Sequence, residues 1–333
     1  MANIDDILHA LNKNKIRATY GAIGQALGVP AIAVGRILGS KRPEASWVVS
    51  ASTGQPSGYS ANEIHTDLLA KDKVIKTGSE LQSMLETRTT ETSRLIGLDL
   101  AWNCEKNGSG LATGRIDGNA IVLEDVQSGI RGLKFIRDAV ISTSGVTGIA
   151  IDAPLIIKNA TGGRHCEKEL SDKYRRYSAG AYPSNLGMKW KSGLALAESL
   201  EDNGFVHLGN KDGKWQIECY PHPAMIEIFG LNERLKYKRK KNMSTQDARD
   251  GQTKLANLIR GLENHQKLPL VIEEKAQSFL DDNRISTLQP SALKHNEDGL
   301  DAIICLYIAA VYSTGSNYQC FGDSETGYII VPS

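Results

Sequence analysis

Apolar residues recur at helical spacing through the first forty residues of the chain. One series over residues 4–11 predicts a helix, and two more lie on either side of a turn at Gly28-Val29-Pro30. Two short helices around such a turn are typical of a helix-turn-helix. A strand at Trp47-Val48-Val49, a turn of small residues and a short helix that ends near Leu69 follow. This order predicts a small, mainly helical winged-helix domain.

The chain after residue 94 begins with patterns typical of buried strands. The pattern predicts three meandering strands, a helix and a fourth strand, at residues 95–102, 108–116, 120–126, 133–141 and 147–152. Asp117-Gly118 is a favourable tight turn between the second and third strands. This order resembles the opening of the ribonuclease H fold, in which the first and fourth strands are neighbours. We therefore expect Asp99 and Asp152 to lie side by side.

A polar segment rich in Thr and Glu separates these two blocks. We place a linker at residues 83–93, between a domain over 1–82 and a domain over 94–333. A length of 333 residues also favours two domains. The predicted fold class is α/β: a ribonuclease H-like mixed sheet with helices, preceded by a small, mainly helical winged-helix domain.

Composition and charge exclude several classes of protein. Hydrophobic residues make up 41% and charged residues 23%, which excludes a mainly disordered chain. With 39 Lys+Arg and 38 Asp+Glu, the net charge of +1 indicates no polyelectrolyte partner, so nucleic-acid binding requires a local patch. The five cysteines are scattered without a CxxC pair, which argues against a disulfide scaffold and a zinc ribbon. No secretory signal or membrane-spanning run is visible, so we expect a cytoplasmic protein, or one associated with the nucleoid, without a membrane partner.

Acidic side chains interrupt several apolar segments of the second domain. Asp99 lies within a strand, where a carboxylate is costly unless it is paired or bound to a ligand. Asp152 ends another strand, and Glu218 lies in a further short strand. Asp298 and Asp301 stand at i and i+3 in what the pattern predicts is the first turn of a helix, so both project from one side of it.

Carboxylate oxygens are the ligands that hard divalent ions prefer, and two such ions can hold the attacking and leaving oxygens of a phosphodiester. We therefore predict a site for two ions, Mg²⁺ or Mn²⁺. The predicted metal ligands are Asp99, Asp152, Glu218, Asp298 and Asp301, and the predicted catalytic residues are Asp99, Asp152, Glu218 and Asp301. Structural roles stay open as alternatives: Asp152 can cap a turn before Ala153-Pro154, Glu218 can pair with Arg164, and the two helical acids can complement the helix dipole.

An ordered set of motifs spans residues 94–333. It runs through Gly97-Leu98-Asp99-Leu100-Ala101-Trp102, Ile151-Asp152-Ala153-Pro154-Leu155, Arg164 with Cys166-Glu167, Glu218-Cys219-Tyr220-Pro221 with Pro223, Leu235-Lys236-Tyr237-Lys238, and Asp298 with Asp301-Ala302. This set resembles a family of predicted ribonuclease H-like nucleases, long described only as a domain of unknown function. The acids are also similar in pattern to those of Holliday-junction resolvases of the same fold. The resemblance implies that fold and a nuclease site.

The same resemblance and a basic run at residues 234–241 indicate where a substrate is held. They imply Arg164 and Glu167 as substrate-binding residues, together with Lys236 and Lys238 of the basic run. A solvated run of charge without a ligand is the alternative for the two lysines.

The motifs of the first domain support a second resemblance. They run through Thr19-Tyr20-Gly21-Ala22-Ile23-Gly24, Val34-Gly35-Arg36-Ile37-Leu38, Trp47-Val48-Val49 with Gly54, and Leu68-Leu69 with Val74. They resemble the DNA-binding domain of O6-alkylguanine-DNA alkyltransferases and alkyltransferase-like proteins over about residues 4–82. The resemblance implies duplex binding, and the residues expected near phosphates are Tyr20, Arg36, Lys41 and Arg42. A helical protein-interaction module is the alternative.

Two departures from that family change the expected chemistry. The family's Pro-Cys-His-Arg segment is Glu44-Ala45-Ser46-Trp47 here, without a thiol to accept an alkyl group. Ile32 stands where the family has an Arg that fills the gap left by a flipped base. We therefore expect DNA binding without alkyl transfer.

Together these features predict a divalent-metal-dependent nuclease that hydrolyses phosphodiesters, with nucleic acid, and DNA in particular, as its partner. Two alternatives stay open. One is a non-catalytic DNA-binding adaptor whose second domain holds a ligand or a partner. The other is a phosphohydrolase that acts on small nucleotides.

Overall fold

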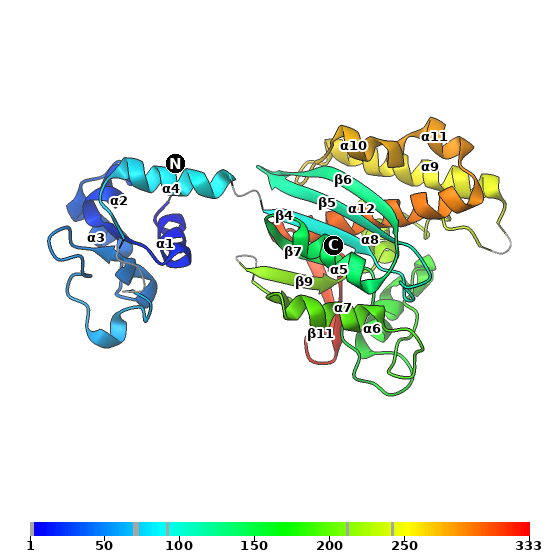
Figure 1. Cartoon of the computed structure of the whole chain (residues 1–333), viewed down its shortest axis with the longest axis horizontal. Coiled ribbons are helices and arrows are strands. Elements are labelled where there is room, and N and C mark those ends of the chain that lie inside the picture. Colours follow the sequence, from blue (N-terminus) through cyan, green and yellow to red (C-terminus); the bar gives the residue numbers. More distant parts are fainter. Residues whose placement is uncertain (1–2, 69–72, 91–92, 211–212, 241–242) are drawn as a thin grey trace. The chain divides into compact units, whose positions relative to one another are not determined.

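The computed structural model describes residues 3–68, 73–90, 93–210, 213–240 and 243–333. It divides the chain into two compact units, Met1–Glu91 and Thr92–Ser333 (Figure 1). Each unit has a hydrophobic core of its own. The first unit is mainly helical and the second is built on a mixed sheet flanked by helices, so the predicted α/β class is confirmed.

The first unit combines short helices with three very short strands. Its elements are α1 (Ile4–Asn14), β1 (Arg17–Thr19), α2 (Tyr20–Leu27), α3 (Ala31–Leu38), β2 (Val48–Val49), β3 (Val74–Ile75) and α4 (Gly78–Thr90). Helices α2 and α3 are bent by 90° at Gly28, whose φ of 69° favours glycine. The Thr19 hydroxyl caps α2 by accepting a hydrogen bond from the Ala22 N–H. This angle and turn are those of a helix-turn-helix pair.

No single helix among the described residues is both long and apolar enough to cross a membrane. Helices α2 and α3 reach that length and apolar composition only together, across their 90° bend.

The sheet of the first unit differs from the predicted winged helix. Strand β1 is central and pairs in parallel with both β2 and β3. A wing is an antiparallel hairpin, and the described residues of this unit contain none, because the three strands are far apart in sequence and no tight turn joins them. The short helix predicted to end near Leu69 cannot be assessed at its end, since residues 69–72 lie outside the described residues; the turn before it, Ala61–Glu63, is a single 3-10 turn.

Most of the predicted linker is helical. Helix α4 continues to Thr90, so residues 83–90 form its second half, and residues 91 and 92 lie outside the described residues. The start of α4 is held on the first unit by the fully buried Leu81 and by a 2.6 Å hydrogen bond from the Gly78 N–H to Gln25. The first unit therefore extends beyond its predicted end at residue 82.

The second unit is built on a seven-stranded sheet in the order β10-β6-β5-β4-β7-β9-β8. Its strands are β4 (Arg94–Asp99), β5 (Ser109–Asp117), β6 (Ala120–Ile130), β7 (Val146–Ile151), β8 (Phe205–His207), β9 (Lys214–Glu218) and β10 (Leu270–Ile272). Strand β5 is antiparallel to β4 and β6, and the other neighbouring pairs are parallel. Asp117 pairs with Ala120 across the predicted tight turn, and β4 lies beside β7. The predicted meander and the neighbourhood of the first and fourth strands are confirmed.

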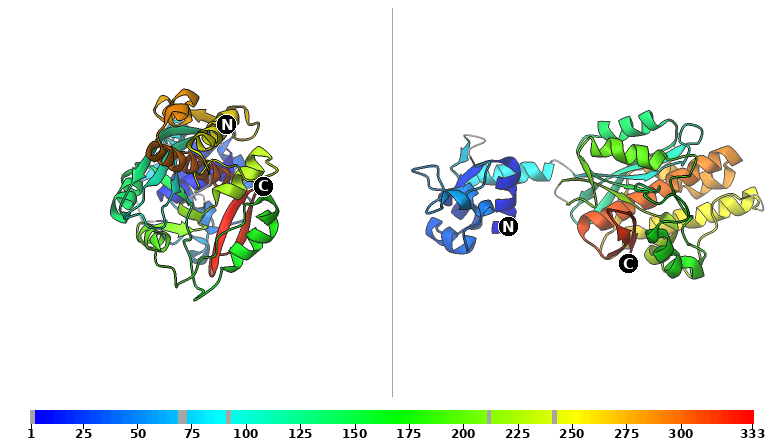
Figure 2. Two further views of the ribbon diagram at one scale, coloured as in Figure 1. Left: turned by 90° about the vertical axis from the view of Figure 1, so that its right-hand side faces the viewer. Right: turned by 90° about the horizontal axis from the view of Figure 1, so that it is seen from below.

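Helices cover both faces of this sheet (Figure 2). On one face, α5 (Leu133–Ser142) and α7 (Ser192–Glu201) pack on alternate apolar residues of β4 and β7. On the other face, α12 (Pro290–Thr314) crosses β4, β5, β6 and β7. Helices α8 (Pro221–Phe229) and α9 (Thr245–Gly261) pack beside α12 on this face, α10 (Glu274–Gln277) packs on β6, and α11 (Asp282–Thr287) packs on α9. The sheet therefore separates two cores.

A smaller layer completes the second unit. Strands β11 (Tyr318–Asp323) and β12 (Gly327–Pro332) form an antiparallel hairpin, and α6 (His165–Tyr174) packs on it. Ile330 of β12 forms a bridge with Cys219, which follows β9. The hairpin and α6 thus lie next to the carboxyl ends of the central strands.

Candidate active site

Two carboxylates lie at the carboxyl ends of adjacent parallel strands. Asp99 is the last residue of β4, and Asp152 directly follows β7, where its N–H donates a 2.8 Å hydrogen bond to the Leu98 carbonyl. Because the register pairs Leu98 with Ile151, the two aspartates stand side by side on the face that α12 covers. Both side chains are half-buried, and neither forms a hydrogen bond or an ion pair with a described residue. Two unbonded carboxylates therefore meet at this edge of the sheet.

Helix α12 places two further acids on the same face. Asp298 and Asp301 are 2% and 0% exposed. The helix begins at Pro290, a residue favoured in a first helical turn, so these acids lie well inside it and not in its first turn as predicted. The polar residues after Pro290 lack a clear apolar period, which explains the error. Since the helix dipole acts at the terminal turns, it gives no account of these two acids.

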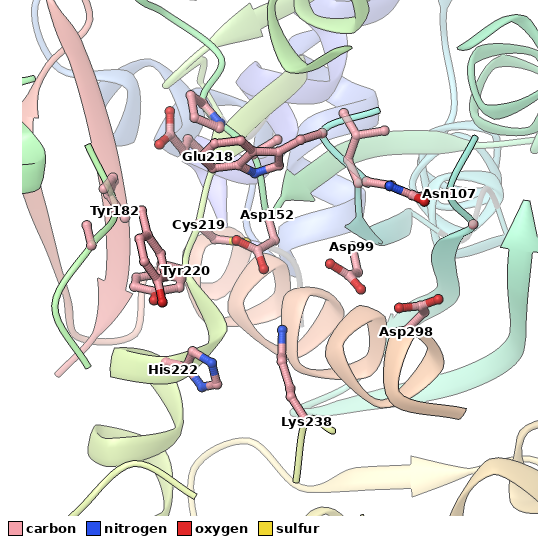
Figure 3. A pocket seen from close by; sticks show the side chains of 18 of the residues that line it. Asp99, Asn107, Asp152, Tyr182, Glu218, Cys219, Tyr220, His222, Lys238 and Asp298 are labelled. Atoms are coloured by element: carbon pink, nitrogen blue, oxygen red, sulfur yellow. The ribbon is translucent and has the colours of Figure 1, made fainter. Parts of the chain in front are cut away.

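Glycines allow α12 to approach the sheet. A Cβ atom at Gly97 of β4 would lie 2.0 Å from the Leu306 nitrogen, and one at Gly110 of β5 would lie 2.0 Å from the Asp298 carbonyl oxygen. These distances are far shorter than any van der Waals contact, so the helix backbone can lie on these strands only where a side chain is missing. This close packing brings Asp298 toward Asp99 (Figure 3).

Cations of the protein neutralise the two acids of α12. The Lys238 ammonium lies 2.6 Å from the Oδ2 atom of Asp301, and the Tyr237 hydroxyl donates a hydrogen bond to Oδ1 of the same carboxylate. The Lys294 ammonium lies 2.6 Å from Asp298. The α12 acids, Asp298 and Asp301, thus differ from Asp99 and Asp152, the strand-end aspartates. The strand-end aspartates have no ion-pair partner among the described residues.

Glu218 lines the same cavity as the strand-end aspartates, but its side chain projects to the other face of the sheet. The register pairs Glu218 with Ile151, whose side chain points away from α12. There Glu218 accepts hydrogen bonds of 2.5 and 2.8 Å from Arg164 and one of 2.9 Å from the Leu155 N–H. The structural alternative for Glu218, a pair with Arg164, is the arrangement observed.

The four residues predicted to bind substrate differ in burial and in their bonding partners. Arg164 and Glu167 are 3% and 4% exposed and are joined by a 2.8 Å hydrogen bond, so their polar groups mainly support the wall of the site. Lys236 is exposed and pairs with Glu233 at 3.1 Å. Only Lys238 reaches the strand-end aspartates with its ammonium group (Figure 3).

Negative charge is in excess at the strand ends. Burial raises the pKa of Asp99 well above its ordinary value, and the charge of Asp301 adds to this effect. Burial also raises the pKa of Asp152 to about 7, although the charge of Lys238 opposes the shift. For Lys238 the neighbouring carboxylates outweigh burial, so its pKa lies well above its ordinary value and the ammonium stays charged. The ammonium groups of Lys238 and Lys294 do not balance the four carboxylates of Asp99, Asp152, Asp298 and Asp301, and a further cation would relieve their repulsion.

The strand-end aspartates open into a cavity of about 610 Å³ (Figure 3). Its basic lining residues are Lys106, Arg131, Arg164, Arg234, Lys238, Lys240 and Lys294. Four of these cations form no ion pair within the described ranges: Lys106, Arg131, Arg234 and Lys240. An acidic centre inside a basic rim suits an anionic ligand that binds together with a metal cation.

The carboxylates of Asp99 and Asp152 are ligands of the type that a hard divalent ion prefers. The oxygens of Asp99 and Asp152 are unbonded and face the cavity. Within the described part of the chain, no group of three or more His, Cys, Asp or Glu side chains is arranged to hold a metal ion. Mg²⁺ commonly binds proteins through one or two carboxylates, with water and substrate phosphate completing its shell. The two aspartates therefore suit one such ion, and the second ion stays a prediction.

A family comparison covers this whole region. Residues 97–326 match the family model described as "Protein of unknown function (DUF429)". The chain belongs to this family. The matched residues include Asp99, Asp152, Lys238 and both acids of α12, so the cavity lies within the DUF429 domain. No curated protein matches the chain at a significant level.

Sequence reasoning missed three of the basic residues that line the cavity of the DUF429 domain: Lys106, Arg131 and Lys294. Lys294 stands four residues before Asp298, and this i, i+4 spacing is a signal that could have been used. Lys106 and Arg131 lie in loops after β4 and β6, and nothing in their local sequence marks them. Their position depends on which strands are neighbours in the sheet.

The four residues expected near phosphates lie in the first unit, outside the DUF429 match. Tyr20 is half-buried, while Lys41 and Arg42 are bonded to neighbouring groups of the same unit. Arg36 is exposed on α3 and has no ion-pair partner in the described residues. Ile32, on the same helix, is 86% exposed. Of the four, Arg36 is thus the best placed for a partner outside the chain.

Proposed function

We propose that the DUF429 domain is a divalent-metal-dependent nuclease that hydrolyses phosphodiester bonds. One observation carries this proposal: Asp99 and Asp152 lie at adjacent strand ends in a cavity with four basic lining residues, and none of these six side chains forms an ion pair with a described residue. The acids suit a divalent ion, and the rim suits a phosphate backbone. A non-catalytic adaptor has no need for unpaired acids with raised pKa values at such a position.

The topology supports the same proposal. The order β6-β5-β4-β7-β9, with β5 reversed and α12 packed on β4, is similar to that of ribonuclease H-like enzymes. In that fold, acids at the ends of the first and fourth strands and on the last helix form the active site. Asp99, Asp152 and Asp298 occupy the corresponding positions in this chain. Because a fold does not by itself imply a function, the carboxylates remain the main support.

Different residues of the cavity would have different roles in such a reaction. Asp99 and Asp152 would hold the ion, which supplies an activated water and neutralises charge on the phosphate. Lys238 stays charged and directs its ammonium toward the same place, so it can donate hydrogen bonds to a phosphate oxygen. Arg234 and Lys240 have no acidic partner among the described residues and can bind the flanking backbone.

Cleavage of labelled DNA and RNA oligonucleotides by the full chain tests this function. We expect cleavage with Mg²⁺ or Mn²⁺ and none after chelation. Asp99→Asn keeps the shape of the side chain and removes its charge, so cleavage should be lost. Asp172→Asn, the same change at an exposed position on α6, is the matched control and should cleave like the wild type. Wild-type protein that cleaves neither polymer with either ion contradicts the proposal, and hydrolysis of small nucleotides alone favours the phosphohydrolase alternative.

We further propose that the first unit binds duplex DNA. The support is the 90° helix pair α2–α3 with an exposed Arg36 on the second helix, which has no ion-pair partner in the part of the chain that the structure describes. In helix-turn-helix proteins that helix enters the major groove. The exposed Ile32 on α3 gives the helix an apolar contact, which is suited to a thymine methyl group.

A further inference from the structure

A second cavity adjoins the cavity that contains Asp99 and Asp152, which we call the acid cavity, and it extends the basic wall of that cavity. It measures about 560 Å³ and lies along the irregular segment that follows α8 and the start of α9. Four residues line both cavities: His222, Arg234, Lys238 and Lys240. Each cavity alone has the size of a small-molecule site, and together they can accept a longer ligand.

Unpaired cations also lie at the other end of the acid cavity. Lys106 and Arg131 line it beside Asn107, and neither pairs with an acid in the described ranges. In Figure 3, Asn107 and His222 lie on opposite sides of the strand-end aspartates. Basic side chains are therefore available on both sides of the acidic centre. A ligand with phosphates on both sides of the reacting bond uses both groups, whereas a mononucleotide uses only one.

Two exposed aromatic rings complete the acid cavity. The Trp102 and Tyr182 side chains are 42% and 67% exposed, and both line the cavity. Burial of such rings normally contributes to stability, so exposed rings at a cavity rim indicate a ligand. Aromatic rings stack on unpaired bases, while the bases of a duplex already stack on one another.

From this combination we infer that the DUF429 domain holds a single-stranded polynucleotide, with bases stacked on Trp102 and Tyr182 and the backbone following Lys106 and Arg131 to Arg234 and Lys240. The inference rests on the proposed function for the reaction that follows, but the binding itself needs no metal ion. Because stacking and phosphate contacts are shared by DNA and RNA, the chemistry is that of any unpaired strand.

Fluorescence anisotropy with the full chain in EDTA tests the inference without cleavage. The probes are a labelled 15-nucleotide DNA strand, an RNA strand of the same sequence and the corresponding DNA duplex. We expect Trp102→Ala and Tyr182→Ala each to weaken single-strand binding about tenfold. Phe135→Ala is the matched control: Phe135 is also 67% exposed, lies on α5 and is absent from both cavities, so affinity should not change. Duplex affinity should be the same in all of these proteins, and melting temperatures check that each variant is folded.

The outcomes separate this inference from the proposed function. Tenfold losses in the cavity variants support a single-strand site even if no ion promotes cleavage. Single-strand affinities that match the wild type in both folded variants overturn the inference, even if the enzyme cleaves some other substrate. A nucleoside monophosphate that competes as well as the 15-nucleotide strand also overturns it, because a single nucleotide would then account for all of the binding. Equal losses for DNA and RNA indicate a general single-strand site, and a loss for one polymer assigns the site to that polymer.

Discussion

Arg164 and Glu218 form a buried two-point ion pair on the side of the sheet that faces away from Asp99. The guanidinium donates hydrogen bonds of 2.5 and 2.8 Å to the two carboxylate oxygens, and a further bond of 3.0 Å to the Ile156 carbonyl. The pair thus ties the segment after β7 to the end of β9. Its role is to hold the strand ends in place, which is the basis for the first prediction.

Loss of the guanidinium should strongly destabilise the second unit. Arg164→Ala leaves Glu218 and Glu167 buried without a cation, and breaking such a pair typically costs about 3–5 kcal/mol. The free energy of unfolding from urea titration measures this change. Lys173→Ala is the control, because its ion pair with Glu227 is partly exposed and should contribute less than about 1 kcal/mol. Equal losses of unfolding free energy in the two variants would show that the buried ion pair stabilises the fold no more than the partly exposed one.

The raised pKa of Asp152 should make the metal-free protein lose stability as the pH rises. The pKa is about 7 in the folded state and about 4 in an unfolded chain, so between these values the folded state binds the extra proton. The free energy of unfolding therefore falls from about pH 4 to about pH 7. Asp152→Asn removes this loss, so its melting temperature in EDTA should rise relative to the wild type between pH 5 and pH 8. The melting temperature of Asp172→Asn should equal that of the wild type at both pH 5 and pH 8. A difference in melting temperature between Asp152→Asn and the wild type that does not change with pH would contradict the raised pKa of Asp152.

A divalent ion should stabilise the wild type because it relieves the same repulsion. At about 100 times its dissociation constant, an ion that binds only the folded state adds about 2.7 kcal/mol. Asp99→Asn should shrink this gain and should raise the melting temperature of the metal-free protein. Calorimetric titration with Mg²⁺ and Mn²⁺ measures the binding directly. A wild type that shows neither heat of binding nor a shift in melting temperature would exclude the metal site.

A methyl group at Gly97 should disturb both the fold and the site. It would meet the α12 backbone at 2.0 Å, and overpacking of this kind typically costs about 1–3 kcal/mol. Cleavage should fall together with stability, since a displaced α12 would also displace Asp298. Gly261→Ala is the control, because a Cβ there meets nothing within 4 Å and α9 should be unchanged or slightly more stable. Circular dichroism melts and cleavage assays on both variants check this prediction, which fails if Gly97→Ala behaves like the control.

Duplex binding by the first unit should depend on Arg36 and on salt. Arg36→Ala removes one exposed cation, so the affinity of the full chain for duplex DNA and the slope of log affinity against log salt should both decrease. Intact-mass analysis after incubation with O6-methylguanine DNA should find no added methyl group, because Glu44-Ala45-Ser46-Trp47 offers no thiol. Lys76→Ala, at an exposed position outside the helix pair, is the control. Salt-independent binding, or equal loss in both variants, would contradict the proposal.

The sequence was sufficient to predict the sheet neighbours that matter most. Apolar runs, the Asp117-Gly118 turn and the intervening helix define the order of β4 to β7, and this order places Asp99 beside Asp152. Local patterns determine such elements because each strand and turn has its own composition. The acidic pair could therefore be found before the structure was known.

Other parts of the site depend on relations between segments. The direction in which Glu218 points relative to Asp152 follows from the register of β7 and β9, and a shift by one residue reverses it. Lys238 meets Asp301 only because an irregular segment after α8 folds back on α12. The start of α12 was placed late because its first turns are polar. None of these relations can be predicted from a short stretch of sequence.

The two walls of the acid cavity differ in how freely they can change. The wall formed by β4 and α12 is interlocked through glycines and nearly complete burial, so a substitution there disturbs the core of the whole unit. The wall formed by residues 231–240 is irregular and its side chains are largely exposed or half-buried. Variation in this second wall can therefore alter which ligand is accepted while the carboxylates stay in place. For the proposed nuclease, substitutions in residues 231–240 would thus change substrate preference without moving Asp99 and Asp152.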